Sequence, residues 1–193
     1  MSNFEEHYFK NLNYSNYLER YGRYSKLAEE LDFYLTKFGF ISKKFKILDY
    51  GCSVGFLIRA FNKLGYKKVF GFDISKWAIS VAKKNKCKTL KNYEGAYDLG
   101  VFLDVLEHMT DKEIKKVFNK TDFKQIIVRI PCSSEKKSQN FHLKVSRADK
   151  THINCKNKLE WISFFKKRGF KKFYPINLNT IYDSKGCFCY LIF

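Results

Sequence analysis

The chain has 193 residues, of which 45% are hydrophobic and 18% are aromatic. This composition is too apolar for an intrinsically disordered chain, and the length suits one domain with a hydrophobic core. The 37 basic and 19 acidic residues leave a net charge of +18, which favours an anionic partner such as nucleic acid or a phosphorylated substrate. The basic residues are mostly lysines spread along the chain in pairs, a pattern that we attribute to the residue bias of an AT-rich genome.

The sequence shows no pattern typical of a membrane span, a secretory signal or a cysteine-based site. The longest apolar runs, such as Cys187 to Phe193, are too short to cross a bilayer, so we expect no association with a membrane. The first residues are polar and aromatic, unlike a secretory signal, and we expect a cytoplasmic protein. Six cysteines without a C-x-x-C pair indicate neither a metal site nor a disulfide framework.

The first half of the chain alternates helix and strand patterns. Apolar residues recur at helical spacing between residues 16 and 38 and predict an N-terminal helix. The run FKILDY, residues 45–50, predicts a buried strand, and residues 54–64 have the pattern of a helix. A second strand is expected at 67–73, followed by a helix that Ser75 caps.

The same rhythm continues beyond residue 85. Short third and fourth strands are expected at 87–90 and 97–105, followed by a helix of about ten residues that Asp111 caps. A fifth strand is expected at 124–131. The alternation predicts right-handed βαβ units and a parallel sheet.

The last third of the chain departs from this rhythm. Residues 132–157 form a long polar segment, and a loop of this length inside a compact domain is usually functional or disordered. A helix then begins at Asn157, and residues 171–176 and 186–193 predict a final pair of strands. We therefore expect an α/β, Rossmann-like, doubly wound sheet of seven mostly parallel strands with one late antiparallel strand, plus the N-terminal helix.

The segment DYGCSVG, residues 49–55, lies where such sheets bind ligands, at the carboxyl end of the first strand. Gly51 and Gly55 permit a positive φ or a close approach of the backbone to a ligand. The absence of a basic residue in this turn argues against a triphosphate. Asp73 ends the second strand, where an acid accepts both hydroxyls of a ribose. A nucleoside without phosphate suggests S-adenosylmethionine.

Three segments together resemble the motifs of class I S-adenosylmethionine-dependent methyltransferases. ILDYGCSVGFL, VFGFDIS and YDLGVFLDVLEHM stand in the order and at the spacing of that family. The likeness is greatest to the small-molecule branch that carries D-x-L-E-H after the fourth strand. It covers residues 45–131 and extends more loosely to the segment THINCKNKLEWISFFKKRGF.

The resemblance implies the residues that hold the cofactor. The first turn faces the methionine part, Asp73 holds the ribose and Ile74 flanks the adenine. Ser53 departs from the family, which more often has glycine there. The complete set implied is Asp49, Gly51, Ser53, Gly55, Phe56, Asp73, Ile74, Leu103 and Asp104.

Methyl transfer to an oxygen or nitrogen atom often needs a base that takes the proton of the acceptor. The candidates are Glu107 and His108, which follow the fourth strand, and His152 in the long polar segment. Histidine suits this role because it titrates near neutral pH.

The acceptor itself would be bound by residues outside the cofactor motifs. Arg147 in the polar segment could hold an anionic group. Tyr17 and Tyr21 of the N-terminal helix could stack on a ring or a sugar. We expect residues 1–40 to form a helical lid and residues 41–193 to form the methyltransferase domain, with 132–157 as its acceptor loop, in one globular domain overall.

The expected function is transfer of a methyl group from S-adenosylmethionine to an oxygen of a small metabolite or sugar, without a metal ion. Two alternatives stay open. The first is an RNA 2′-O-methyltransferase with a divalent metal at Asp104, Glu107 and His108, a ligand set that His142 or His152 could complete. The second is a non-enzymatic, lysine-rich module of the same fold that binds nucleic acid.

Overall fold

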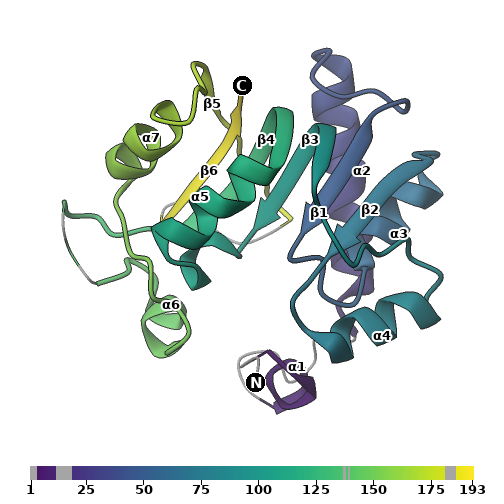
Figure 1. Cartoon of the computed structure of the whole chain (residues 1–193), viewed down its shortest axis with the longest axis horizontal. Coiled ribbons are helices and arrows are strands. Elements are labelled where there is room, and N and C mark those ends of the chain that lie inside the picture. Colours follow the sequence, from purple (N-terminus) through teal and green to yellow (C-terminus); the bar gives the residue numbers. More distant parts are fainter. Residues whose placement is uncertain (1–3, 12–18, 137, 139, 181–185) are drawn as a thin grey trace. The chain divides into compact units, whose positions relative to one another are not determined.

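A computed structural model describes residues 4–11, 19–136, 138, 140–180 and 186–193 of the chain (Figure 1). It divides the chain into two compact units. The first unit is Met1–Tyr93 with Tyr97–Leu99, and the second is Glu94–Ala96 with Gly100–Phe193. The expectation of a single domain with an N-terminal lid stays a prediction.

The first unit contains two parallel strands with helices before and after them. Its elements are α1 (Glu6–Asn11), α2 (Tyr21–Lys37), β1 (Lys46–Tyr50), α3 (Phe56–Lys63), β2 (Lys68–Phe72) and α4 (Lys76–Lys84). β1 pairs with β2 in parallel, and Asp49 lies opposite Gly71. Both strands and α3 confirm the sequence expectation to within two residues. The helix expected from residue 16 is described only from Tyr21, because residues 12–18 lie outside the described part.

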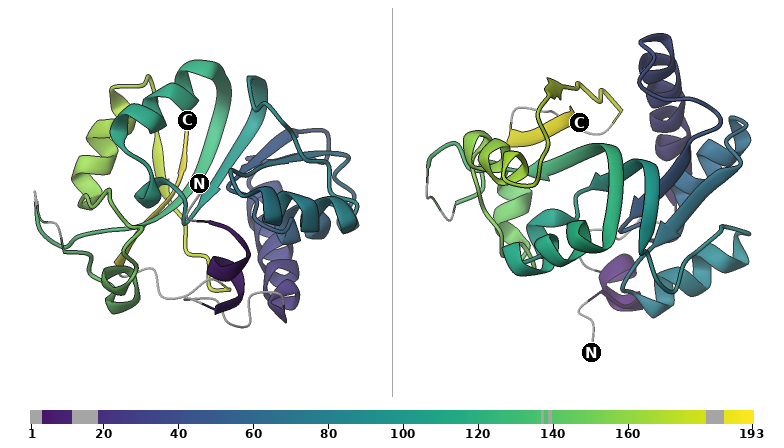
Figure 2. Two further views of the ribbon diagram at one scale, coloured as in Figure 1. Left: turned by 60° about the horizontal axis from the view of Figure 1, so that its bottom comes forward. Right: turned by 45° about the horizontal axis from the view of Figure 1, so that its top comes forward.

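The second unit begins within β3 (Gly95–Leu103), which the two units share. Its further elements are the short 3-10 helix η2 (Leu106–His108), α5 (Asp111–Lys120), β4 (Thr121–Pro131), α6 (Lys144–Ala148), α7 (Lys158–Lys166), β5 (Phe173–Pro175) and β6 (Cys187–Ile192). Helices α5 and α7 lie side by side (Figure 2). The rings of Phe118 on α5 and Phe165 on α7 meet edge to face with their centroids 5.9 Å apart. α6 was not expected, because it lies within the polar segment 132–157.

The strand order is β2-β1-β3-β4-β6-β5. β6 runs antiparallel to both β4 and β5, which confirms the expected late antiparallel strand. The expectation of seven strands is wrong, because the sheet has six strands among the described residues. Residues 87–90 form only the isolated bridge between Gly71 and Thr89, in which Gly71 exchanges hydrogen bonds with Lys88 and Leu90. Between the end of α4 at Lys84 and the start of β3 at Gly95, this bridge is the only strand pairing among the described residues.

Helix ends follow the expected capping chemistry with one correction. Ser75 accepts the backbone N–H of Ala78 at 3.0 Å and caps α4 as predicted. Asn157 likewise caps α7 through a capping box with Glu160. Thr110, not Asp111, caps α5, because its extended backbone turns its hydroxyl oxygen toward the N–H of Glu113.

The N-terminal residues pack over the start of α3 and α4. Tyr8 and Phe9 are buried in a cluster with Val54, Phe56 and Ala78. Phe9 also stacks on Trp77 with their ring centroids 5.4 Å apart. Among the described helices, none has both the length and the hydropathy that crossing a membrane requires.

Gly71 is the residue of β2 that leaves room for the turn after β1. A Cβ atom at this position would lie 2.6 Å from Cys52 Sγ and would also meet Ile58. We expect Gly71→Ala to lower the free energy of unfolding by about 1–3 kcal/mol, since overpacking forces neighbours to move. Urea unfolding measures the change. The matched control is Gly22→Ala in α2, where nothing lies within 4 Å of the added carbon, and equal losses in both variants would contradict this interpretation.

Candidate active site

The turn between β1 and α3 is held in a strained backbone conformation. Gly51, Ser53 and Gly55 have φ values of 80°, 49° and 81°. At Gly55 a Cβ atom would lie 2.5 Å from Cys87 Sγ, so only glycine fits there. The φ of Ser53 lies in the left-handed region that glycine adopts without strain. The turn thus combines left-handed backbone with close packing against Cys87.

Asp73 closes this turn through its carboxylate. Ser53 N–H donates to one carboxylate oxygen and Ser75 N–H to the other, each at 2.8 Å. The N–H groups of Gly51 and Cys52 donate to the carbonyl oxygen of Phe72, at 2.7 and 3.1 Å. Asp73 therefore shapes the turn and the start of α4 in addition to any contact with a ligand.

Asp49 is a buried acid at the end of β1, with 6% of its surface exposed. Burial, and next the charge of Asp73, raise the pKa of Asp49 to about 7. A cationic group bound beside it would lower this pKa again, because it favours the ionised carboxylate. The end of β1 is therefore suited to a ligand that carries a positive charge.

The other predicted cofactor residues differ in setting. Phe56 is buried in the first unit, whereas the side chain of Ile74 is 57% exposed. Leu103 and Asp104 belong to the second unit. Asp104 has a φ of 54° and forms an ion pair with the buried Arg129. Arg129 was missed by the sequence reasoning, because it lies inside an apolar strand with no motif to mark it.

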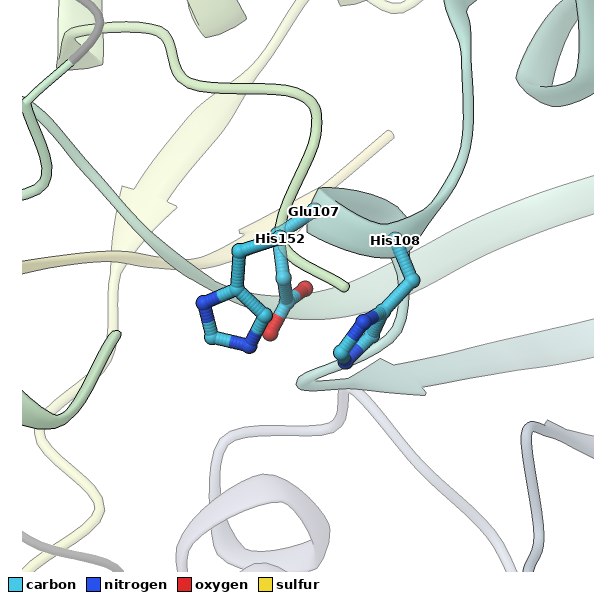
Figure 3. Close-up of side chains that lie close together, drawn as sticks. All are labelled: Glu107, His108 and His152. Carbon is cyan, nitrogen blue, oxygen red and sulfur yellow. The ribbon is translucent and has the colours of Figure 1, made fainter. Parts of the chain in front are cut away.

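A second polar group lies just after β3, in the second unit. Glu107 and His108 are on η2, and His152 lies on the segment after α6. Their side chains turn toward one another (Figure 3), and one donor atom of each lies within 4.8 Å of the others. The two imidazole rings meet edge to face at 4.6 Å. The structure thus brings together the three residues predicted to carry the chemistry.

Backbone and side-chain hydrogen bonds fasten the segment of His152 to η2. Ile153 and Asn154 both donate their backbone N–H to the carbonyl oxygen of Glu107, at 2.9 Å. Thr151 contacts His108 Nδ1 through its hydroxyl at 2.9 Å and its carbonyl oxygen at 3.2 Å. These contacts hold this part of the predicted acceptor loop close to the end of β3.

Asp149 and Thr151 are functional candidates that the sequence reasoning missed. The backbone N–H and the hydroxyl of Thr151 donate to one carboxylate oxygen of Asp149, and the other lies 3.7 Å from His152 Nε2. The available signal was the spacing D-x-T-H, since an aspartate two residues before a threonine favours a turn closed by its own side chain.

Burial sets the charge states of the three clustered residues. It raises the pKa of Glu107 well above its usual range, helped by the charge of Asp104. It lowers the pKa of His108 to about 4, with the charge of His152 second, and it lowers the pKa of His152. Both imidazoles are therefore neutral at pH 7 and can accept a proton or bind a metal ion.

The predicted acceptor residues lie in different places. Arg147 is exposed on α6 and donates to the carbonyl oxygen of Phe141 at 3.1 Å, and the ring of Phe141 lies 5.3 Å from that of His152. Tyr21 belongs to the first unit and packs on Phe56. Tyr17 lies outside the described residues.

The raised pKa of Asp49 predicts a pH-dependent stability. The folded chain keeps a proton on Asp49 that the unfolded chain releases near pH 4, so this contribution is present at low pH and is lost as the pH rises toward 7 and beyond. We expect urea unfolding of the ligand-free protein to show a larger loss between pH 5 and pH 8 than in Asp49→Asn. Asp122→Asn, at an exposed position, should behave like the wild type. An unchanged pH dependence in Asp49→Asn would contradict the burial argument.

Comparison with curated proteins finds relatives of low identity. The chain is 26% identical over 147 residues to the ribosomal protein L11 methyltransferase of Thermotoga petrophila, a match that covers 70% of this chain and 54% of the relative. The chain thus spans about half the length of the curated relatives that it matches.

Solved structures resemble the fold over nearly all of the chain. Magnesium protoporphyrin IX methyltransferase from Synechocystis PCC 6803, solved with S-adenosylmethionine bound, has a TM-score of 0.63 at 15% identity and covers 96% of this chain and 92% of its own. A methyltransferase from Archaeoglobus fulgidus has the same TM-score at 16% identity, over 93% and 98% of the two chains. The methyltransferase domain family matches residues 18–173, so the chain belongs to that family.

Proposed function

We propose that this chain transfers the methyl group of S-adenosylmethionine to an oxygen atom of a small metabolite or sugar. The turn after β1 carries the proposal. It combines left-handed backbone at Gly51, Ser53 and Gly55 with the carboxylate of Asp73 at its edge. Magnesium protoporphyrin IX methyltransferase from Synechocystis PCC 6803, which has a similar fold, was solved with S-adenosylmethionine bound and with its homocysteine product bound.

The charge of the cofactor fits the end of β1. S-adenosylmethionine carries a sulfonium and an ammonium group, both of them cationic. The pKa of the buried Asp49 is raised by burial and by the charge of Asp73, and no described cation lowers it. A cationic ligand there would offset the cost of burying the carboxylate. A triphosphate would add negative charge beside Asp49 and Asp73, and is disfavoured.

The likeness to the D-x-L-E-H branch is supported by where Glu107 and His108 lie. They form η2 directly after β3, and His152 joins them from the segment after α6. In the reaction the acceptor oxygen forms a bond to the methyl carbon, the carbon–sulfur bond breaks with its electron pair left on sulfur, and the acceptor proton departs. A neutral histidine of this cluster would take that proton, although burial lowers the pKa of both histidines and so makes each a weaker base than the sequence led us to expect.

Burial of the cluster favours a small acceptor. Glu107 is completely buried and the side chain of His152 is only 7% exposed, so a folded macromolecule cannot reach them with its surface. The relatives do not decide the acceptor, since one is described as acting on a ribosomal protein and another on a magnesium porphyrin. Family membership favours an enzyme over the non-enzymatic nucleic-acid module.

RNA is the runner-up acceptor, through the 2′-hydroxyl of a nucleotide that enters the site singly. The net charge of +18 supports it, because lysines attract the phosphate backbone in a salt-dependent manner. A tritiated methyl group offered side by side to a metabolite extract and to total RNA separates the two acceptors. Label that appears only in RNA would replace the first choice by the second.

Asp73→Ala should weaken S-adenosylmethionine binding at least tenfold, about 1.4 kcal/mol, because it removes the ribose acceptor and releases the turn at Ser53. Isothermal calorimetry on folded protein measures the affinity, with Asp122→Asn as the control. Wild-type protein that gives neither heat nor a thermal shift with the cofactor would refute the proposed function.

His152→Ala and Arg147→Ala should each lower turnover at least about tenfold, roughly 1.4 kcal/mol of barrier, while cofactor affinity stays near that of the wild type. His142→Ala is the matched control, because His142 is an exposed histidine of the same segment. If both variants lose cofactor affinity and keep their activity per bound cofactor, the segment binds the cofactor rather than the acceptor.

A further inference from the structure

We propose that Glu107, His108 and His152 bind a divalent transition-metal ion. The proposal departs from the metal-free site expected from the sequence. It narrows the alternative metal set, since His152 rather than His142 joins Glu107 and His108, and Asp104 is not part of the cluster. It begins with the geometry in Figure 3, where one carboxylate and two imidazoles from two chain segments converge.

The spacing of the donor atoms suits a metal ion. They lie within 4.8 Å of one another. At bond lengths of about 2.1 Å, two donors on opposite sides of a metal are about 4.2 Å apart, and adjacent donors are closer. A small inward movement of the side chains would therefore complete the coordination.

Glu107 supplies a second, independent observation. Neither of its carboxylate oxygens has a hydrogen-bond partner among the described residues, although the side chain is completely buried. Burying an acid without a partner is costly, and natural structures rarely leave one so. A metal ion between Glu107 and the two histidines would supply the missing partner.

The surroundings of the histidines resemble the outer shell of a metal site. Ligand histidines usually hydrogen bond through their second ring nitrogen to a carbonyl or a carboxylate, which fixes the ring orientation. His108 Nδ1 contacts Thr151, which assigns Nε2 to the metal. His152 has the carboxylate of Asp149 at 3.7 Å from Nε2, and Asp149 is itself held by Thr151. The rings are therefore oriented before a metal binds.

The donor set selects the class of metal. Two imidazoles and one carboxylate suit Zn²⁺, Mn²⁺, Fe²⁺ or Co²⁺, whereas Mg²⁺ and Ca²⁺ prefer oxygen ligands. Asp104 would have made the set richer in oxygen. Its carboxylate is engaged instead by Arg129, which neutralises it inside the second unit.

Three protein ligands leave positions for a further ligand. On the proposed function, on which this step alone rests, the hydroxyl of the acceptor would occupy one of them. Metal binding would lower the pKa of this hydroxyl, so its proton would pass to solvent water before or during methyl transfer, because both histidines would be ligands and could not take it. This site would favour small acceptors whose hydroxyl group is accessible enough to reach the metal.

Metal binding can be tested without the cofactor or any acceptor. The chelator-treated full chain is titrated with Co²⁺ and followed by visible absorption, and with Zn²⁺, Mn²⁺ and Mg²⁺ by calorimetry. We expect one Co²⁺, Zn²⁺ or Mn²⁺ per chain and at least tenfold weaker binding of Mg²⁺. Glu107→Gln and His152→Ala should each weaken Co²⁺ binding at least tenfold, whereas His142→Ala should bind like the wild type.

Thermal unfolding guards against variants that merely misfold. Without metal, Glu107→Gln should unfold at the same or a higher temperature than the wild type, because it replaces a buried acid by a neutral group of the same shape. Metal should stabilise the wild type and His142→Ala but not Glu107→Gln. The proposed site would be overturned if no metal binds or if all variants bind it equally. It would also be overturned by a near-ultraviolet thiolate band, which would show that Co²⁺ is bound by cysteine.

Failure of the metal site and failure of the proposed function give different results. S-adenosylmethionine binding by the chelated protein depends on the turn after β1 and not on this cluster. A chain that binds the cofactor but no metal refutes the metal site alone. A chain that binds metal but not the cofactor retains the site and refutes the proposed function.

Discussion

The cost of burying negative charge is the constraint on which the two polar sites depend. Asp49 at the end of β1 and Glu107 after β3 are both nearly or completely enclosed, and burial raises the pKa of each. An apolar residue at either position would pack without this penalty. The chain retains carboxyl groups there, which is explained if each receives a positive charge: the cofactor at Asp49 and a metal ion at Glu107.

Asp73 in the first unit differs from these two acids, because hydrogen bonds from the backbone offset part of the effect of burial, which still raises its pKa. Its two oxygens already accept backbone N–H groups from Ser53 and Ser75, so its charge is partly satisfied within the fold. This carboxylate maintains the left-handed turn in the absence of a ligand. The turn is therefore preorganised, and the binding energy of a cofactor is not spent on ordering it.

Much of the fold could be predicted because its signals are local. Hydrophobic periodicity and glycines located β1, α3 and β2 closely, and cap residues located α4 and α7. The predicted strand at 87–90 was wrong. Four residues of suitable type form a strand only if they pair along their length, and here Thr89 alone forms a bridge, with Gly71 of β2. α6 escaped prediction since five residues within a polar segment carry little periodicity.

The residues of the site could be predicted individually from sequence motifs, but their arrangement in space could not. Glu107 and His108 follow a recognisable strand, and His152 was a candidate from its segment, but their convergence depends on how residues 149–154 fold back onto η2. The pairing of Asp104 with Arg129 joins the residue after β3 to a residue of β4, and spacing along the chain cannot indicate such a pair. Long-range electrostatic pairs of this kind decide which of several nearby acids is available to a ligand.

Because its pKa is raised to about 7, we expect the buried acid at the end of β1 to be largely protonated below pH 7 in the empty protein and ionised when a cationic cofactor binds. Calorimetry of S-adenosylmethionine binding near pH 6.5, in buffers of different ionisation enthalpy, measures the protons exchanged. We expect the wild type to release a net fraction of a proton on binding and Asp49→Asn to release less. Binding heat that is independent of the buffer, or proton uptake, would contradict it.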